Sequence, residues 1–476
     1  MSALEPVIGL EIHVQLSTRT KMFCGCELSF GDPPNTHTCP VCLGLPGALP
    51  VANARAVDFG IRIGLALGCE IAASSAFHRK NYFYPDLPKG YQISQYDEPL
   101  CRGGALGEVR IHRVHLEEDA AKLVHVGESG RIHGSGASVV DFNRGGTPLV
   151  EIVTEPDICA PAQAREWLGL LRTTLRQLGV SDVNMEEGSL RCDANVSLRP
   201  AGSSGLGTKT ELKNMNSFRF VERGLDAEIE RQAALLDAGE PVVQQTLHYD
   251  PAGGTLTPLR SKEEAHDYRY FPEPDLVPLR VGEEMVEAAR AALPELPARR
   301  AERYETELGL PPDLARQHAY RAELGDYFEA ALGAAPEGIE PRAIANWTGN
   351  ELVARIGEQD PARSNVAPEA LAALVAMVGA GEITGAAART VLDRLAEAGG
   401  DPRAIAASEG LGAMGDGDEL ATIVADALAA NPGAAEKVRA GNLKALGPIV
   451  GHVMRETRGR ADGAEVQRLV REQLGS

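Results

Sequence analysis

The sequence predicts an α+β protein with a large β-rich domain followed by two helical domains. Residues 1–290 contain short alternating strands separated by Gly- and Pro-rich turns. From about Glu283 onward, Ala, Leu, Glu and Arg recur at the helical period, with Pro at the expected helix starts. A Gly-rich break at 410–418 precedes the last helical segment. We therefore expect domains at 1–290, 291–407 and 408–476.

The size and charge of the chain limit its function. Its 476 residues are enough for several domains with buried cores. A net charge of −20 argues against broad electrostatic coating of a nucleic acid, so any such contact must be local. The N-terminus does not resemble a signal peptide, and no apolar run reaches the roughly 18 residues of a membrane span. We expect a cytoplasmic protein with no membrane partner.

The first strand carries acid and imidazole groups on one face. Residues 7–16 alternate strictly, so Glu11, His13 and Gln15 share one face while aliphatic side chains occupy the other. A carboxylate and an imidazole therefore lie side by side. Such a face suits a divalent metal ion and a phosphate-bearing substrate.

Two later segments repeat this pattern. His115, Glu117 and Asp119 share one face of a predicted strand. Glu151 stands among the apolar residues of 148–153, where an ionised carboxylate is costly unless a cation or an Arg side chain meets it. A metal ion would meet this carboxylate.

Cationic side chains accompany the carboxylates on two further strands. The polar face of 190–199 begins with Arg191, and alternation groups Lys209 with Lys213 around an intervening Glu. Taken singly, each strand is also compatible with a half-solvated antiparallel strand. Together they supply the groups that phosphoryl transfer requires, although the chain has no Walker P-loop and is therefore not a P-loop NTPase.

Four of the eight cysteines form a compact pattern. Cys24 and Cys26 are followed, after a short loop, by Cys39 and Cys42. In a large chain without an export signal, this clustering favours a metal over disulfides. We predict a structural zinc site, because four thiolates leave no open coordination position. Reduced cysteines in a buried loop, or replacement of one ligand by His37, are the alternatives.

Two segments combine aromatic and cationic residues with turn formers: 78–96 and 266–275. Such loops can stack a base and bind phosphate, which suits a nucleotide or the end of a tRNA. Loops packed by their own aromatic side chains are the alternative.

The second half of the last helical segment is locally basic within an acidic chain. A solvated helical face is the alternative to a nucleic-acid contact. The candidates for that contact are Lys437, Arg439, Lys444, Arg455 and Arg458.

At several of these motifs the chain resembles a known family, the B subunit of the bacterial tRNA-dependent aspartyl/glutamyl amidotransferase of the GatCAB type. The resemblance runs from end to end. It implies a cradle-shaped catalytic domain, related to glutamine-synthetase-type kinases and built on a mixed or antiparallel sheet, then a helical domain and a small helical tail. The matching motifs are 7–14, 80–92, 115–119, 151–153 and 266–275.

The resemblance implies an ATP-dependent ligase that uses glutamine as amido donor. ATP would phosphorylate the side-chain carboxylate of Glu misacylated on tRNA-Gln, or of Asp on tRNA-Asn, and ammonia would then displace phosphate. The ammonia would come through a channel from an amidase (A) subunit, and a small C subunit would complete a heterotrimer. Consistently, no Ser- or Cys-centred triad signature is readable in this chain.

By motif position, the family's Mg²⁺ ligands and catalytic residues fall on Glu11, His13, Glu117 and Glu151. The zinc cluster occurs in many members, and the inserted domain of an archaeal relative is absent here, which favours the bacterial type. Our candidates for binding ATP are Arg191, Lys209, Lys213 and Lys89.

Two other functions compete with this one. A ligase acting on a free amino acid would turn over ATP without tRNA, but the long helical extension and basic tail argue against it. A non-catalytic tRNA-binding scaffold with a zinc knuckle would leave the carboxylate-lined face unexplained.

Overall fold

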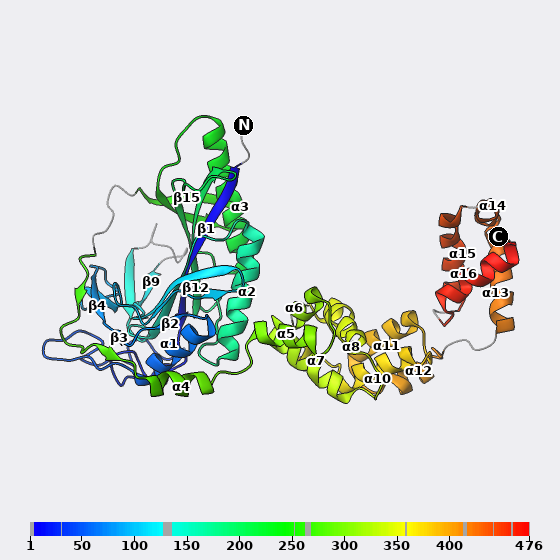
Figure 1. Ribbon diagram of the computed structural model, residues 1–476, viewed down its shortest axis with the longest axis horizontal. Helices are drawn as coiled ribbons and strands as arrows, with labels where there is room; N and C mark the ends of the chain where they lie inside the picture. Colours follow the sequence, from blue (N-terminus) through cyan, green and yellow to red (C-terminus); the bar gives the residue numbers. More distant parts are fainter. Residues whose placement is uncertain are drawn as a thin grey trace. The chain divides into compact units, whose positions relative to one another are not determined.

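The computed structural model describes most of the chain. The described residues are 4–29, 31–126, 136–251, 253–261, 268–357, 359–412, 417–440, 442–457 and 460–475. They form two compact units, Met1–Leu296 and Pro297–Ser476 (Figure 1). None of the described helices is both long enough and apolar enough to cross a bilayer.

The first unit combines a large sheet with helices and short strands. Its elements in chain order are β1 (Leu4–Gln15), α1 (Ala54–Ala66), β2 (Glu70–Ile71), β3 (Ser74–Ser75), β4 (His78–Asn81), β5 (Tyr91–Ser94), β6 (Cys101–Arg102), β7 (Ala105–Leu106), β8 (Val109–Glu118), β9 (Lys122–Val126), β10 (Ala137–Asp141), β11 (Pro148–Thr154), α2 (Pro161–Gln177), β12 (Leu190–Pro200), β13 (Thr210–Lys213), α3 (Phe218–Asp237), β14 (Gln245–Asp250), β15 (Thr255–Ser261), β16 (Phe271–Pro272), β17 (Leu279–Arg280) and α4 (Glu283–Ala291).

The ten-stranded sheet has the order β15-β14-β13-β12-β1-β11-β8-β6-β2, and β7 pairs with β8. Its pairings are antiparallel except for the parallel pair β13–β14, so the sheet is mixed. Smaller sheets join β9 with β10, β3 with β17, and β4 with β5 and β16. The predicted combination of a large sheet with many helices is confirmed.

The central strand β1 separates an apolar face of the sheet from a polar one. Leu10, Ile12 and Val14 are fully or almost fully buried, as their alternation requires. Helices cover this apolar face: α1 approaches Leu116 of β8 at Gly60, and Gln232 of α3 donates a hydrogen bond to the Val196 carbonyl of β12. The opposite face of the same strands is therefore left to polar side chains.

The second unit is helical, and Pro residues begin many of its helices, as predicted. Its elements are α5 (Pro297–Thr306), α6 (Pro312–Ala319), α7 (Ala322–Ala334), α8 (Pro341–Asn346), a π-helix (Trp347–Leu352), α9 (Val353–Ile356), a 3₁₀ turn (Pro361–Arg363), α10 (Pro368–Gly379), α11 (Gly385–Ala398), α12 (Pro402–Ser408), α13 (Gly417–Ala430), α14 (Pro432–Arg439), a 3₁₀ turn (Leu443–Ala445), α15 (Leu446–Glu456) and α16 (Gly463–Leu474).

Two hydrophobic cores hold these helices together. One core draws buried residues from Ala301 to Leu411. The other draws them from Leu420 to Leu474. The apolar stripes of the earlier and the later helices are thus buried in different cores.

Candidate functional site

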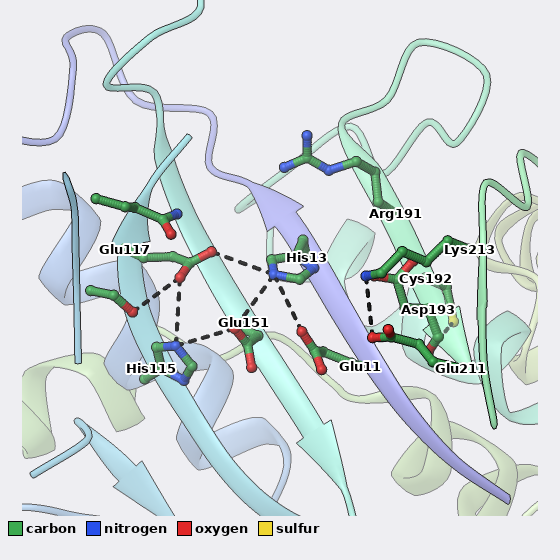
Figure 2. Close-up of polar contacts among 12 residues, drawn as sticks. Glu11, His13, His115, Glu117, Glu151, Arg191, Cys192, Asp193, Glu211 and Lys213 are labelled. Atoms are coloured by element: carbon green, nitrogen blue, oxygen red, sulfur yellow. Dashed lines mark hydrogen bonds and ion pairs between the residues drawn. The ribbon is translucent and has the colours of Figure 1, made fainter. Parts of the chain in front are cut away.

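A row of charged residues crosses the polar face of the large sheet. Register places Glu151 of β11 opposite His115 of β8 on one side and opposite His13 of β1 on the other. His13 in turn lies opposite Arg191 of β12. Because residues paired across a sheet point to the same face, the four side chains form one line over four strands (Figure 2).

Five residues of this face form what we term the carboxylate–histidine cluster: Glu11, His13, His115, Glu117 and Glu151. The Nε2 atom of His13 lies 3.4 Å from carboxylate oxygens of both Glu117 and Glu151, and 3.9 Å from Glu11. The Nε2 atom of His115 lies 3.4 Å from Glu151 and 3.7 Å from Glu117. Two carboxylates and two imidazoles therefore close a ring, with Glu11 beside it (Figure 2).

The charges of the cluster depend on one another. Burial opposes ionisation of Glu151, yet its contacts with His115 and His13 hold the pKa of its carboxyl well below its usual range. Burial also opposes a charge on His115, but Glu151 and Glu117 raise its pKa to about 9. Burial and the nearby Glu151 raise the pKa of Glu11. Together with Arg113, which lies 3.3 Å from Glu151, protonated imidazoles supply the positive charge that these carboxylates need.

The donor atoms of the cluster fit a divalent cation. Two sets of three donors share Glu151, and within each set the atoms lie within 4.8 Å of one another. One set contains Glu11 and His13, and the other contains His115 and Glu117. Carboxylate oxygens suit Mg²⁺ and Mn²⁺, and imidazole nitrogen suits softer divalent ions such as Zn²⁺ or Fe²⁺. The structure thus brings together all four ligands predicted from the sequence, and their metal binding stays a prediction.

Two cations lie on the other side of β1. The Nζ atom of Lys213 contacts the Asp193 carboxylate and lies 3.3 Å from Glu211. Asp193 lies opposite Glu11 in the sheet register. Arg191 and Lys213 are 35% and 38% exposed, so both are open to an incoming anion.

Arg191 is held by a buried carboxylate beyond the end of β8. Asp119 accepts hydrogen bonds from Arg191 at 3.0 Å and from the Gln15 amide at 2.7 Å. Burial opposes its ionisation, but Arg191 and Arg144 lower the pKa of Asp119. Alternation predicted that Asp119 shares the face of Glu117, and the structure shows that on this face it fixes the Arg191 guanidinium.

The other two predicted ATP-binding lysines lie outside this network. Lys209 immediately precedes β13 and is exposed. Lys89 forms an ion pair with Glu118, which alternation places on the face of β8 opposite Glu117. It also lines a cavity of about 70 Å³ together with Cys24 and Cys42. A role for either lysine in binding ATP stays a prediction.

The four clustered cysteines converge as their spacing predicts. Their sulfur atoms lie within 4.8 Å of one another, and those of Cys39 and Cys42 are 3.9 Å apart. A tetrahedral zinc ion with thiolate ligands requires about 3.8 Å between sulfurs. A hydrogen bond from Cys24 lowers the pKa of the Cys42 thiol to about 4, and Lys21 contributes. His37 instead contacts Asp32 at 2.7 Å.

The predicted nucleic-acid-binding cations of the tail lie on its surface. Lys437 and Arg439 are on α14, Lys444 is in the following 3₁₀ turn, and Arg455 is on α15. All four are exposed, and no ion pair involves them within the described part of the tail. Arg458 lies outside the described residues.

Comparison with known proteins identifies the family. Residues 6–287 match the GatB/GatE catalytic domain, and residues 326–474 match the GatB domain. The chain belongs to the GatB family. The first match contains every residue of the carboxylate–histidine cluster, and the second contains the basic surface of the tail. The resemblance inferred from the motifs is confirmed for this GatB-family chain.

Curated relatives cover the whole GatB-family chain. A protein of Anaeromyxobacter dehalogenans (strain 2CP-1) is 50% identical over 100% of this chain and 99% of its own length. One from Frankia casuarinae is 52% identical over 100% of this chain and 96% of its own length. One from Brevibacillus brevis is 47% identical over the full length of both. All three are named as the B subunit of an aspartyl/glutamyl-tRNA(Asn/Gln) amidotransferase.

Sequence reasoning did not select every residue of this GatB-family site. His115 shares the strand face of Glu117, but only the pairing of β8 with β11 shows that it contacts Glu151. Ser94 was also missed, although its hydroxyl donates a hydrogen bond to Glu117 at 3.0 Å. The alternation of His115 was a usable signal. Ser94 carried none, because its contact joins strands that are distant in sequence.

Proposed function

We propose that this chain is the B subunit of an aspartyl/glutamyl-tRNA amidotransferase, a glutamine-dependent ligase. In this proposal it phosphorylates the side-chain carboxylate of Glu misacylated on tRNA-Gln, of Asp misacylated on tRNA-Asn, or of both. The observation that carries the proposal is the carboxylate–histidine cluster flanked by Arg191 and Lys213, within a chain of the GatB family.

The reaction has two steps. An oxygen of the substrate carboxylate attacks the γ-phosphorus of ATP, the bond to the bridging oxygen breaks, and ADP leaves. Ammonia then attacks the acyl carbon of the resulting acyl phosphate, phosphate leaves, and the nitrogen loses a proton to give the amide. Phosphorylation makes the second step feasible because phosphate is a far better leaving group than oxide.

The charged residues of the polar face have different roles in this reaction. Glu11, His13, Glu117 and Glu151 would hold Mg²⁺, which when bound offsets the charge of the phosphates. Arg191 and Lys213 bind phosphate oxygens, and to do so they exchange carboxylate partners for the phosphates. Before phosphate binds, Asp119 holds the Arg191 guanidinium at the edge of the site.

The remaining parts of the proposal concern the assembly. The cradle-like domain at 1–290 carries the kinase site, with Cys24, Cys26, Cys39 and Cys42 as a structural zinc site. Domains at 291–407 and 408–476 follow, and the tail cations contact tRNA. An amidase subunit supplies ammonia, and a small C subunit completes a cytoplasmic heterotrimer.

Transfer of the ATP γ-phosphate tests this function. The chain is co-expressed with its A and C subunits and assayed with Mg²⁺ and either Glu-tRNA-Gln or Asp-tRNA-Asn. We expect transfer that requires both Mg²⁺ and charged tRNA, and the active tRNA identifies the substrate. Turnover without tRNA would instead indicate a small-molecule ligase, and no turnover would indicate a binding scaffold.

A further inference from the structure

Five tyrosines from three chain segments form a continuous row of rings, which we term the tyrosine row: Tyr84, Tyr82, Tyr268, Tyr270 and Tyr96. Tyr96 and Tyr270 stack at 4.3 Å with 8° between their planes, and Tyr82 and Tyr84 stack at 5.7 Å. Tyr268 joins the two stacks by edge contacts at 6.5 and 6.0 Å. The two segments singled out in the sequence therefore meet in one structure.

The tyrosine row lies beside the carboxylate–histidine cluster. Ser94 precedes Tyr96 by two residues, and its hydroxyl donates a hydrogen bond to Glu117 of the cluster. Lys80 lies 4.9 Å from the centre of the Tyr268 ring. Lys80 also lies near enough to Glu117 for their charges to interact. A cation thus stands where the row meets the cluster.

The row is also open to solvent. Tyr84 and Tyr96, at its two ends, are 41% and 57% exposed. Parallel exposed rings next to a cation are the arrangement on which single-stranded nucleic acids stack their bases. A loop packed only by its own aromatic side chains would bury these end rings.

The position of the tyrosine row indicates which of the two substrates, ATP or charged tRNA, it contacts. Arg191 and Lys213 lie on β12 and β13, across β1 from β8, whereas the row adjoins Glu117 on β8. In phosphoryl transfer the attacking and leaving oxygens lie on opposite sides of the phosphorus. If the cations bind the ATP phosphates, the attacking carboxylate must enter from the side of the row.

We propose that the tyrosine row stacks the base of the terminal adenosine of the charged tRNA and so directs its aminoacyl group toward the carboxylate–histidine cluster. This inference rests on the proposed function. The amino acid is esterified to the ribose of that same nucleoside, so stacking of its base limits where the side-chain carboxylate can lie.

The test compares two tRNAs on three versions of the assembled heterotrimer. The tRNAs are intact uncharged tRNA and the same tRNA lacking its terminal adenosine. The proteins are wild type, Tyr96→Ala and Tyr96→Phe, which keeps the ring. Stacking of one base contributes enough that its loss should weaken binding about tenfold. We expect removal of the adenosine to weaken binding to wild type and Tyr96→Phe about tenfold, but not to weaken binding to Tyr96→Ala further.

Other outcomes would overturn the inference. An equal loss from all three proteins on removal of the adenosine would show that Tyr96 does not stack its base. A raised KM for ATP in Tyr96→Ala, with unchanged tRNA affinity, would place the adenine of ATP on the row instead. Tyr84→Ala, at the other end of the row, provides a second variant if Tyr96→Ala fails to fold.

The experiments test the stacking inference and the proposed kinase function independently. Binding of uncharged tRNA does not require phosphorylation, so the binding comparison is independent of catalysis. If charged tRNA is phosphorylated but Tyr96→Ala binds both tRNAs as wild type does, only the stacking inference is wrong. If the binding pattern is as expected but no phosphate is transferred, the kinase function is wrong.

Discussion

The two halves of the polar face differ in their charged groups and in their exposure to solvent. On β8, β11 and β1, three carboxylates and two histidines are gathered, and Glu117 is only 2% exposed. On β12 and β13, Arg191 and Lys213 are about one-third exposed, and each already has a carboxylate partner. In the first half, Arg113 pairs with Glu151 at 3.3 Å, and the histidines supply further positive charge only when protonated. The second half holds cations that can exchange partners, and the contrast explains why a metal–phosphate pair would fit across β1.

The largest effect is expected from neutralising Glu151, the carboxylate that contacts both histidines. Glu151→Gln keeps the shape but removes the charge, so we expect amide formation to fall by more than about 100-fold. Glu155→Gln is the matched control, because Glu155 lies just beyond the same strand and its carboxylate pairs with the exposed His112 rather than with the cluster. The measurement is product formation over a Mg²⁺ titration, with thermal unfolding to check the fold. Wild-type activity in Glu151→Gln would refute the metal site.

The second test removes a cation from the other half. Lys213→Met keeps the length of the side chain but leaves nothing to bind phosphate, so we expect kcat to fall by about 10². Arg199→Met is the control, because Arg199 lies at the far end of β12 in an ion pair with Glu5. Steady-state kinetics with ATP as the varied substrate measure the change. Equal kinetics for the two variants would remove Lys213 from the site.

The third test asks whether the face depends on the proposed zinc site at Cys24, Cys26, Cys39 and Cys42. Asn35 and His37, between the two cysteine pairs, hydrogen bond to Asp141 and Asn143, so the cysteine loop supports the segment that leads into β11. Cys24→Ser should abolish zinc binding and lower the Tm by about 5–10 °C. Cys159→Ser, an exposed cysteine outside the cluster, serves as control. Zinc content is measured on the purified variants, and calorimetry gives their Tm. An unchanged Tm in protein that has lost zinc would contradict a structural role for the metal.

The smallest expected effect is in the tail, far from this face in sequence. Lys437→Ala or Arg439→Ala should weaken tRNA binding a few-fold and reduce the slope of log affinity against log salt by about 0.7–0.9 per cation. Arg468→Ala is the matched control, because Arg468 of the same tail already pairs with Glu465 and Glu472. Affinity is measured over a salt series. Slopes equal to that of Arg468→Ala would argue that the basic surface is only solvated.

Local alternation was enough to predict which residues share a strand face. It grouped Glu11 with His13 and placed Glu117 on its strand face, and the structure shows that these side chains meet. What it could not supply was register, which depends on pairing between distant segments. That is why the contact of His115 with Glu151 was missed.

The end of a strand sets a second limit. Asp119, one residue beyond the end of β8, still shares the polar face and contacts Gln15 and Arg191 there. Lys209 fits the alternation of Lys213, but β13 begins only at Thr210. Beyond the end of a strand, alternation no longer determines the face, and where a strand ends depends on its neighbours.

The central position of β1 has a consequence for synthesis. Its register partners on β11 and β12 come more than 130 residues later, because Glu11 pairs with Val153 and Asp193. At about 5–20 residues per second, the ribosome needs roughly 10–40 s to complete both partners after β1 has been made. During that interval an apolar strand with two unpaired edges waits for its neighbours. The nascent chain should therefore depend on chaperones until β12 has left the ribosome.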